Sequence, residues 1–166
     1  MTIGQIAVFA VVIVSALGCL RGVLREARGE PMRLWRLFAT PLLALGTAVV
    51  LLLFPTTESN DIVLWGMTLV IGLAVGVARG FFINFQVDHQ WHLIRLLNAS
   101  DGRSSAIALV VLGALEIVAA LWQPAGSPYH PLLAACTATF AGFLVGRVAT
   151  VLSRARQESH FELRAQ

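Results

Sequence analysis

The sequence predicts an all-α transmembrane protein, a five-helix bundle with its N-terminus outside and a small cytoplasmic β-hairpin between the third and fourth helices. Three observations support this prediction: five long apolar segments, the placement of every arginine on one side of the membrane that they define, and one stretch in which apolar and polar residues alternate. We expect a single membrane domain, residues 1–152, followed by a cytoplasmic tail, residues 153–166.

The composition is that of a chain whose main solvent is lipid. It is 57% hydrophobic and 13% charged, whereas soluble domains carry roughly 25% charged residues. So few charges cannot cover a globular surface in water. The net charge of +3 does not indicate nucleic-acid binding, because the arginines flank apolar segments, as topology determinants do.

Five apolar segments have the length of a membrane span. Segments of about 17 to 21 residues in helical form cover roughly 25 to 32 Å, close to the thickness of the hydrocarbon core. Tryptophans stand at or near several of their ends, where an amphipathic ring is most stable. The predicted spans are Ile3–Leu20, Leu37–Phe54, Ile62–Ala78, Ala106–Trp122 and Leu132–Leu152.

The arginines define the orientation of the bundle. All twelve basic residues are arginine, and they lie in segments 21–36, 79–103 and 147–164. The connections 55–61 and 123–130 contain none. In a five-span arrangement the three basic segments share one side of the membrane, which is cytoplasmic by the positive-inside rule. We therefore expect the N-terminus outside and the C-terminus inside.

The connection after the third span contains a strand pattern. Apolar and polar residues alternate along residues 83–93, and a period of two is typical of a strand. Asp88, His89 and His92 have the types of metal ligands, but alternation puts the two histidines on opposite faces, so we expect no metal site. The apolar row that would face the lipid, the helix ends or a partner includes Phe85, Val87, Trp91 and Leu93.

Glycines four residues apart mark two spans as packing helices. Such spacing forms a flat stripe along one helix face, which lets two backbones approach closely. We expect the third span to pack against the fifth or another neighbour, with a homodimer or partner-binding face as the alternative. The predicted helix-packing residues are Gly72, Gly76, Gly80, Gly142 and Gly146.

Glu116 is the one ionisable residue well inside a predicted span. A carboxylate there costs roughly 2.5 to 3.5 kcal/mol on insertion scales and is a candidate for function. Polar residues expected at similar depth are Gln5, Thr68 and Thr137. Two interpretations stay open: a carboxyl group that makes an interhelical hydrogen bond or reaches outer water, and a group that serves transport or proton relay.

The remaining ionisable and reactive side chains form no catalytic constellation. Arg79 and Arg147 lie near the cytoplasmic ends of spans, and we interpret both as anchors whose side chains reach the interface. Cys19 and Cys136 would be much farther apart than the ~7 Å that a disulfide can bridge. We expect no cofactor and no enzymatic activity.

The order of parts resembles the CcdC-type bacterial membrane proteins, a family named through an association with cytochrome c maturation. The matching stretches are RGVLREARGEPMRLWRLFATPLLALG and GVARGFFINFQVDHQWHLIRLL. The resemblance implies a multi-pass protein of the bacterial cytoplasmic (inner) membrane. It also implies two short strands in the polar insert, here Ile83–Val87 and Trp91–Arg95. The family has no catalytic residues to assign to this chain.

These observations favour a non-catalytic function. We expect an accessory, assembly or subunit role in a membrane complex, linked by the resemblance to cytochrome c maturation. The alternative is a small transporter or channel subunit that uses Glu116, and a third is a membrane enzyme of unknown chemistry. The expected partners are the lipid bilayer and another membrane protein, or a second copy through the glycine faces, and not nucleic acid.

Overall fold

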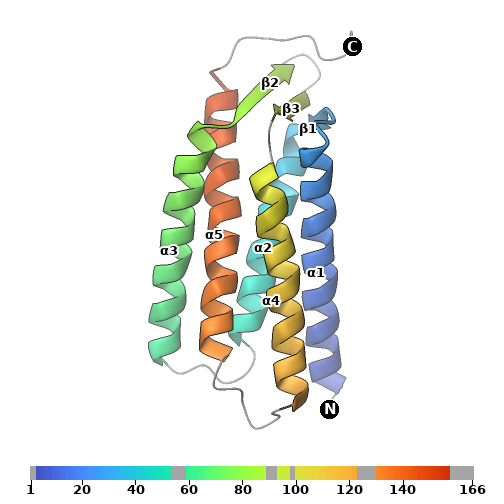
Figure 1. The fold of residues 1–166 in the computed structure, drawn as a ribbon, viewed down its shortest axis with the longest axis vertical. Coiled ribbons are helices and arrows are strands. Elements are labelled where there is room, and N and C mark those ends of the chain that lie inside the picture. The colour runs from blue at the N-terminus through green and yellow to red at the C-terminus, as the bar shows by residue number, and fades with distance from the viewer. Residues whose placement is uncertain (1–2, 54–58, 89–92, 98–99, 123–129, 158–166) are drawn as a thin grey trace.

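The computed structural model describes five stretches of the chain, residues 3–53, 59–88, 93–97, 100–122 and 130–157. Long helices run side by side as a bundle, and a small sheet lies across one of its ends (Figure 1). We call this the sheet end. The helices are α1 (Ile3–Ala27), α2 (Leu34–Leu53), α3 (Ser59–Phe81), α4 (Ser100–Trp122) and α5 (His130–Ala155).

Four of the described helices are long and apolar enough to cross a membrane. The remaining helix, α1, is not one of these four. It is helical along its predicted span, but its last turns carry Arg21, Arg25 and Glu26. Five helices with a small sheet between α3 and α4 confirm the predicted fold class. The four segments are Leu34–Leu51, Ile62–Phe81, Asp101–Ala119 and His130–Ala155.

Most helices extend beyond the apolar segments that predict them. α1 continues from Leu20 to Ala27, α4 begins at Ser100 instead of Ala106, and α5 runs to Ala155, into the predicted tail. Backbone hydrogen bonding, unlike lipid solvation, does not require apolar side chains, so a helix can continue into the polar interface. The extensions place several charged residues on rigid helix ends.

A glycine ends α1 and connects it to the sheet. Gly29 has φ 65°, a conformation that glycine adopts without steric cost, and its N–H donates to the Glu26 carbonyl at 3.1 Å. This is a common way to terminate a helix. The Gly29 carbonyl in turn accepts a hydrogen bond from Arg95 Nε at 2.9 Å. The turn after α1 is therefore held against the third strand.

The sheet has three antiparallel strands in the order β1-β3-β2. The central hairpin consists of β2 (Asn84–Asp88) and β3 (Leu93–Leu97), so both expected strands are present and begin one or two residues later. The hairpin turn, residues 89–92, lies outside the described residues. β1 (Met32–Arg33), from the connection between α1 and α2, pairs with β3 and was not predicted.

The hairpin register changes which residues share a face. Val87 pairs with Ile94, whereas Leu93 pairs with Asp88. Successive residues of a strand point to opposite faces, so Leu93 lies on the face opposite Val87, and the prediction of one row containing both is wrong. The apolar residues of the alternating row therefore do not all lie on one face of the hairpin.

The inner face of the sheet covers the ends of α2 and α5. Val87, Ile94 and Leu96 are buried in one hydrophobic cluster with Leu37 of α2 and Val148 of α5. Val87 is therefore a core residue, while Phe85 and Leu93 are half-buried. The remaining member of the predicted surface, Trp91, lies outside the described residues.

α3 and α5 pack along a seam of glycines. A Cβ on Gly76 would lie 2.1 Å from the Phe143 carbonyl oxygen, and one on Gly146 would lie 2.2 Å from the Leu73 carbonyl oxygen. No side chain fits at such distances, so the two backbones are in direct contact. The other glycines of the seam are Gly72, Gly80 and Gly142. All five are used within the chain, and α3 lies at the edge of the bundle beside α5 (Figure 1).

Candidate functional site

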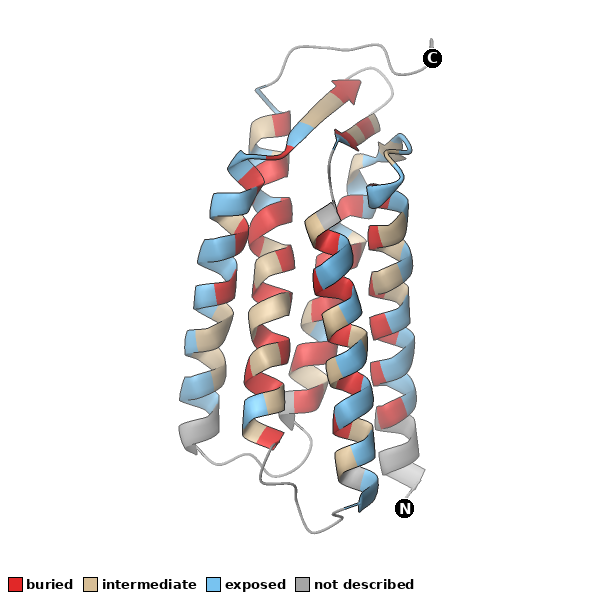
Figure 2. Ribbon diagram, in the orientation of Figure 1, coloured by how far each residue is buried: buried red, intermediate tan, exposed pale blue. Residues whose placement is uncertain are grey.

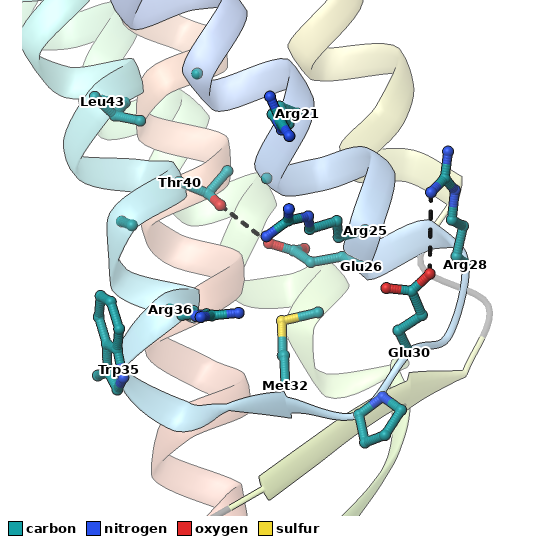
Figure 3. A pocket seen from close by; sticks show the side chains of 14 residues that line it. Arg21, Arg25, Glu26, Arg28, Glu30, Met32, Trp35, Arg36, Thr40 and Leu43 are labelled. Atoms are coloured by element: carbon teal, nitrogen blue, oxygen red, sulfur yellow. Dashed lines mark hydrogen bonds and ion pairs between the residues drawn. The ribbon is translucent and has the colours of Figure 1, made fainter.

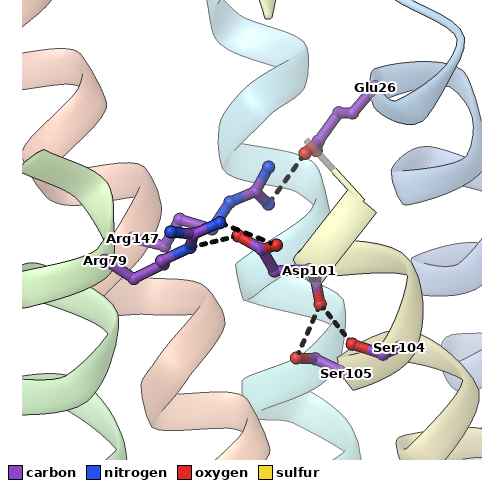
Figure 4. A network of polar contacts seen from close by, with 6 residues as sticks. All are labelled: Glu26, Arg79, Asp101, Ser104, Ser105 and Arg147. Carbon is purple, nitrogen blue, oxygen red and sulfur yellow. Dashed lines mark hydrogen bonds and ion pairs between the residues drawn. The ribbon is translucent and has the colours of Figure 1, made fainter. Parts of the chain in front are cut away.

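A buried ion pair joins α1 and α5 near the sheet end. Arg147 Nη1 donates to Glu26 Oε2 at 3.0 Å, and each side chain is 1% exposed. The other oxygen, Oε1, accepts a hydrogen bond from Thr40 Oγ1 of α2 at 3.2 Å. The Glu26 carboxyl group therefore connects three helices, and Figure 4 shows the side chain of Arg147 extended toward it.

A glycine in α4 makes room for the guanidinium group. A Cβ on Gly102 would lie 2.6 Å from Arg147 Nη1, so any larger residue would displace the arginine. Burial raises the pKa of the Glu26 carboxyl group, and the adjacent Arg147 charge opposes this effect. Within the described residues, Arg147 Nε and Nη2 have no hydrogen-bond partner. The Arg147 guanidinium group therefore has hydrogen-bond donors that the Glu26 carboxylate does not use.

A second, more exposed ion pair joins α3 and α4 at the same level. Arg79 makes two hydrogen bonds to the Asp101 carboxylate, one of them from Nη2 to Oδ1 at 3.0 Å. The hydroxyl groups of Ser104 and Ser105 donate to the Asp101 carbonyl. Figure 4 shows the two ion pairs close together. With Thr40 on α2, this polar layer involves all five helices.

The structure corrects one prediction and adds a residue. Arg147 is not an anchor that reaches the interface, because its side chain is buried against Glu26. Arg79 is 45% exposed, as an interface position allows. Glu26 falls between the predicted spans, in the basic segment 21–36, yet it continues the buried face of α1 that includes Cys19 and Val23. That helical spacing, carried through the basic segment, is the signal that could have identified it.

A cavity of about 560 Å³ opens between α1 and α2 beside the buried ion pair (Figure 3). Its apolar lining includes Gly18, Ala39 and Leu43. Trp35 stands near its edge and is largely exposed. Its charged lining consists of Arg21, Arg25, Glu26, Arg28, Glu30 and Arg36.

The cavity has an excess of positive charge. Glu26 is already bound to Arg147, and Glu30 lies 3.9 Å from Arg28. The other three arginines of the lining, Arg21, Arg25 and Arg36, make no ion pair within the described residues. An anion entering this cavity would therefore meet arginine side chains that are not neutralised by a carboxylate.

A third buried polar contact lies at the opposite end of the bundle. Glu116 of α4 is hydrogen-bonded through Oε1 to Nδ1 of His130 in α5, and both side chains are buried. Glu116 Oε2 has no partner among the described residues. The histidine was expected in a loop, so its role was missed. It is placed by the start of α5 two residues earlier than predicted.

The neighbours predicted for Glu116 make other contacts. Thr68 donates to the Trp65 carbonyl and Thr137 to the Leu133 carbonyl, each within its own helix. The side chain of Gln5 lies outside the described part of the structure. The interhelical hydrogen bond of Glu116 is thus made by a histidine instead of a hydroxyl group or an amide.

The other candidate side chains provide no further site. Asp88 is buried at the end of β2, and the neighbouring histidines fall in the turn outside the described residues. Cys19 and Cys136 are free thiols. Across the described stretches, no three His, Cys, Asp or Glu residues are grouped so that they could hold a metal ion.

The fold and these polar clusters define a helical membrane protein, since four apolar helices of sufficient length enclose a few buried, paired charges. Comparison of the chain with protein-family models, with curated proteins and with solved structures finds no match.

Proposed function

We propose that this protein is a non-catalytic accessory or assembly subunit of a membrane complex, and that it crosses the bacterial cytoplasmic membrane several times. The observation that carries the proposal is the position of α3. This helix is held along one narrow seam of glycines and leaves the rest of its apolar surface uncovered. A helix in that position can contact another membrane protein without any change in the rest of the bundle.

The apolar surface of α3 is far more exposed than that of α5, the helix it packs against. Only 11% of its apolar window is buried, compared with 56% for α5, and the contrast is visible in Figure 2. In lipid such a surface is compatible with either acyl chains or a partner helix. The large exposed side chains of α3 are Ile62, Val63, Leu64, Met67, Val70, Ile71, Leu73, Val75 and Phe81.

Site-specific photo-crosslinking in intact cells tests this proposal. A photoreactive residue at Val70, which is 64% exposed on α3, is expected to give one discrete protein adduct. The matched control is Val14 of α1, which is 70% exposed and is expected to give only lipid adducts. The same adducts at both positions, or lipid adducts alone, would contradict a partner surface on α3.

The proposed link to cytochrome c maturation rests on the resemblance to CcdC-type proteins and has its own test. Deletion of the gene in its host is expected to lower the amount of haem covalently attached to c-type cytochromes, with the apoproteins still made. Complementation with the intact chain restores the amount. Unchanged covalent haem in the deletion strain would remove the link and leave the accessory role to the crosslinking experiment.

A second candidate function is a transporter or channel subunit, which the buried pair of Glu116 and His130 favours. Both side chains are of ionisable types and are buried, and Glu116 Oε2 is unpartnered within the described residues. Buried ionisable groups at membrane depth often mark ion pathways. The test is proton or solute flux in reconstituted liposomes. Loss of a measurable flux in Glu116→Gln, with normal folding, would support transport over the accessory role.

A further inference from the structure

The arginines of the chain gather at one end of the bundle. Eleven of the twelve lie within the described residues, on the helix ends and strands near the sheet end or in the turns that follow α1 and α5, and Arg164 falls outside them. Several are already occupied: Arg147 by Glu26, Arg79 by Asp101, and Arg154 by the carbonyl oxygens at the end of α3. The arginines around the cavity between α1 and α2 differ, because they surround an open space.

We infer that the cavity between α1 and α2 is a binding site for a phosphate-bearing anion, with the headgroup of an anionic phospholipid as its occupant. Arg25 of α1 and Arg36 of α2 extend from the two facing helices into the space between them (Figure 3). Arginine binds phosphate oxygens through a planar set of donors. This inference does not depend on the proposed accessory role.

The shape of the cavity fits a molecule with one charged and one apolar end. Along the two helices, the lining residues nearest the sheet include Arg25, Arg28 and Arg36, and those farthest from it are Gly18 and Leu43. A volume of about 560 Å³ lies within the range of ordinary ligand sites, about 300 to 1,000 Å³. Leu43 is partly exposed on the side of α2, so an acyl chain can leave the cavity toward the bilayer.

α1 and α2 approach each other closely at residues that line the cavity, so the cavity has a wall formed by both helices. A Cβ on Gly22 would lie 2.6 Å from Thr40 Oγ1, and one on Gly18 would lie 3.0 Å from Leu43 Cδ1. Thr40 in turn is hydrogen-bonded to Glu26. The buried ion pair of Glu26 and Arg147 thus positions the two helices that bear the arginines, and it neutralises a carboxylate that would otherwise repel an anion.

Arg36 is also placed by its neighbour. Its guanidinium carbon lies 5.6 Å from the centroid of the Trp35 ring, within the range of a cation–π contact. Tryptophan rings favour the membrane interface, which is the depth of lipid phosphate groups. The arrangement therefore brings an arginine and an interfacial anchor together where the headgroup of a phospholipid lies.

The test compares lipid binding by the detergent-purified full chain and by variants of matched charge. Native mass spectrometry counts bound phosphatidylglycerol and bound phosphatidylcholine, the zwitterionic control. The double variant Arg25→Gln, Arg36→Gln is expected to weaken phosphatidylglycerol binding on the order of tenfold or more. The control variant Arg33→Gln, Arg103→Gln removes two exposed charges from the same end but outside the cavity, and it is expected to bind as the unmodified chain does.

Two further measurements separate a lipid headgroup from free phosphate. Ala39→Phe fills the apolar part of the cavity and is expected to weaken phosphatidylglycerol binding while leaving inorganic phosphate binding, measured by calorimetry, unchanged. If inorganic phosphate binds more tightly than the lipid, and its binding depends on the same two arginines, the cavity is an anion site whose occupant is a soluble phosphate and not a lipid. Equal losses in the two charge variants, or equal binding of the two lipids, would overturn the inference.

Discussion

Arg147 and Glu26 are 121 residues apart in the sequence, and their side chains form a hydrogen-bonded ion pair at 3.0 Å in the interior of the bundle. Both side chains are buried, and they contact Thr40 of α2 and lie beside Gly102 of α4. A buried charge is stable only when it is paired. This contact therefore fixes the position of α1 relative to α5 at the sheet end, where the arginine-lined cavity opens.

Removing one partner of this pair is expected to be strongly destabilising. Arg147→Met leaves the Glu26 carboxyl group buried without its counter-ion, which typically costs about 3 to 5 kcal/mol. The double variant Glu26→Gln, Arg147→Met removes both charges and should recover part of that loss. Thermal unfolding in detergent micelles, followed by circular dichroism, measures both effects. Arg103→Met, at an exposed position, is the control, and an equal loss there would contradict the importance of burial.

The glycine seam predicts opposite effects for two substitutions in one helix. Gly76→Ala places a methyl group against the Phe143 carbonyl oxygen, so α3 and α5 must separate, at a cost of about 1 to 3 kcal/mol. Gly66→Ala meets nothing within 4 Å and should stabilise α3 by up to about 1 kcal/mol through helix propensity. Unfolding midpoints compare the two. Gly76→Ile should prevent assembly of the bundle altogether, and a fully folded Gly76→Ile protein would refute the seam.

The contact between α4 and α5 at the opposite end can be measured by a double-mutant cycle. Glu116→Ala, His130→Ala and the double variant should give a coupling energy of about 0.5 to 3 kcal/mol, because the two buried side chains bind each other. The free energy of unfolding in detergent is the readout. Glu116→Ala combined with the distant Arg103→Ala should be additive. A coupling energy of zero for the first pair would mean that the hydrogen bond contributes nothing to stability.

The predicted orientation has a direct test at the two ends of the bundle. In a chain whose Cys19 and Cys136 are replaced by alanine, a cysteine at Trp122 is expected to react with a membrane-impermeant reagent added outside intact cells. A cysteine at Gln157 should react only after the membrane is permeabilised. Both positions are exposed in the structure, so access is limited by the membrane alone. The reverse pattern would invert the arrangement.

If the cavity binds an anionic lipid, loss of an arginine that lines it should weaken lipid binding, whereas loss of an arginine elsewhere should not. Arg21→Gln alters an arginine of the lining that has no ion pair among the described residues, and it should weaken binding of phosphatidylglycerol several-fold in native mass spectrometry. Arg156→Gln removes an equal charge from the end of α5, away from the cavity, and should leave binding unchanged. Stability should be the same in both variants, because both side chains are exposed.

The five helices could be predicted from the sequence because each depends on local composition. A run of apolar residues long enough to cross the hydrocarbon core indicates directly that lipid surrounds it. The glycines at intervals of four report a helix face on which a backbone can approach, although not which helix approaches it. The alternation along residues 83–87 correctly indicated a strand, because the period of two is a property of the strand itself.

The pairings could not be predicted in the same way. Thr68 and Thr137 were plausible partners for Glu116 by depth, yet His130 is the partner, because the rotation of α4 and α5 about their axes decides which side chains meet. The depth of a residue in the membrane follows from its position along an apolar segment, so it can be predicted from the sequence. Rotation depends on packing between helices, and it also decided that Arg147 turns inward.

The sequence by itself determined that this chain is a bundle of apolar helices with its arginines toward one end and a strand pair between α3 and α4. The tertiary structure alone decided that Glu26 belongs to α1 and binds Arg147, that β1 joins the sheet, and that four arginines share one cavity. The physical reason is the range of the interactions. Solvation and helix formation act on neighbouring residues, whereas ion pairs and cavities arise where distant segments meet.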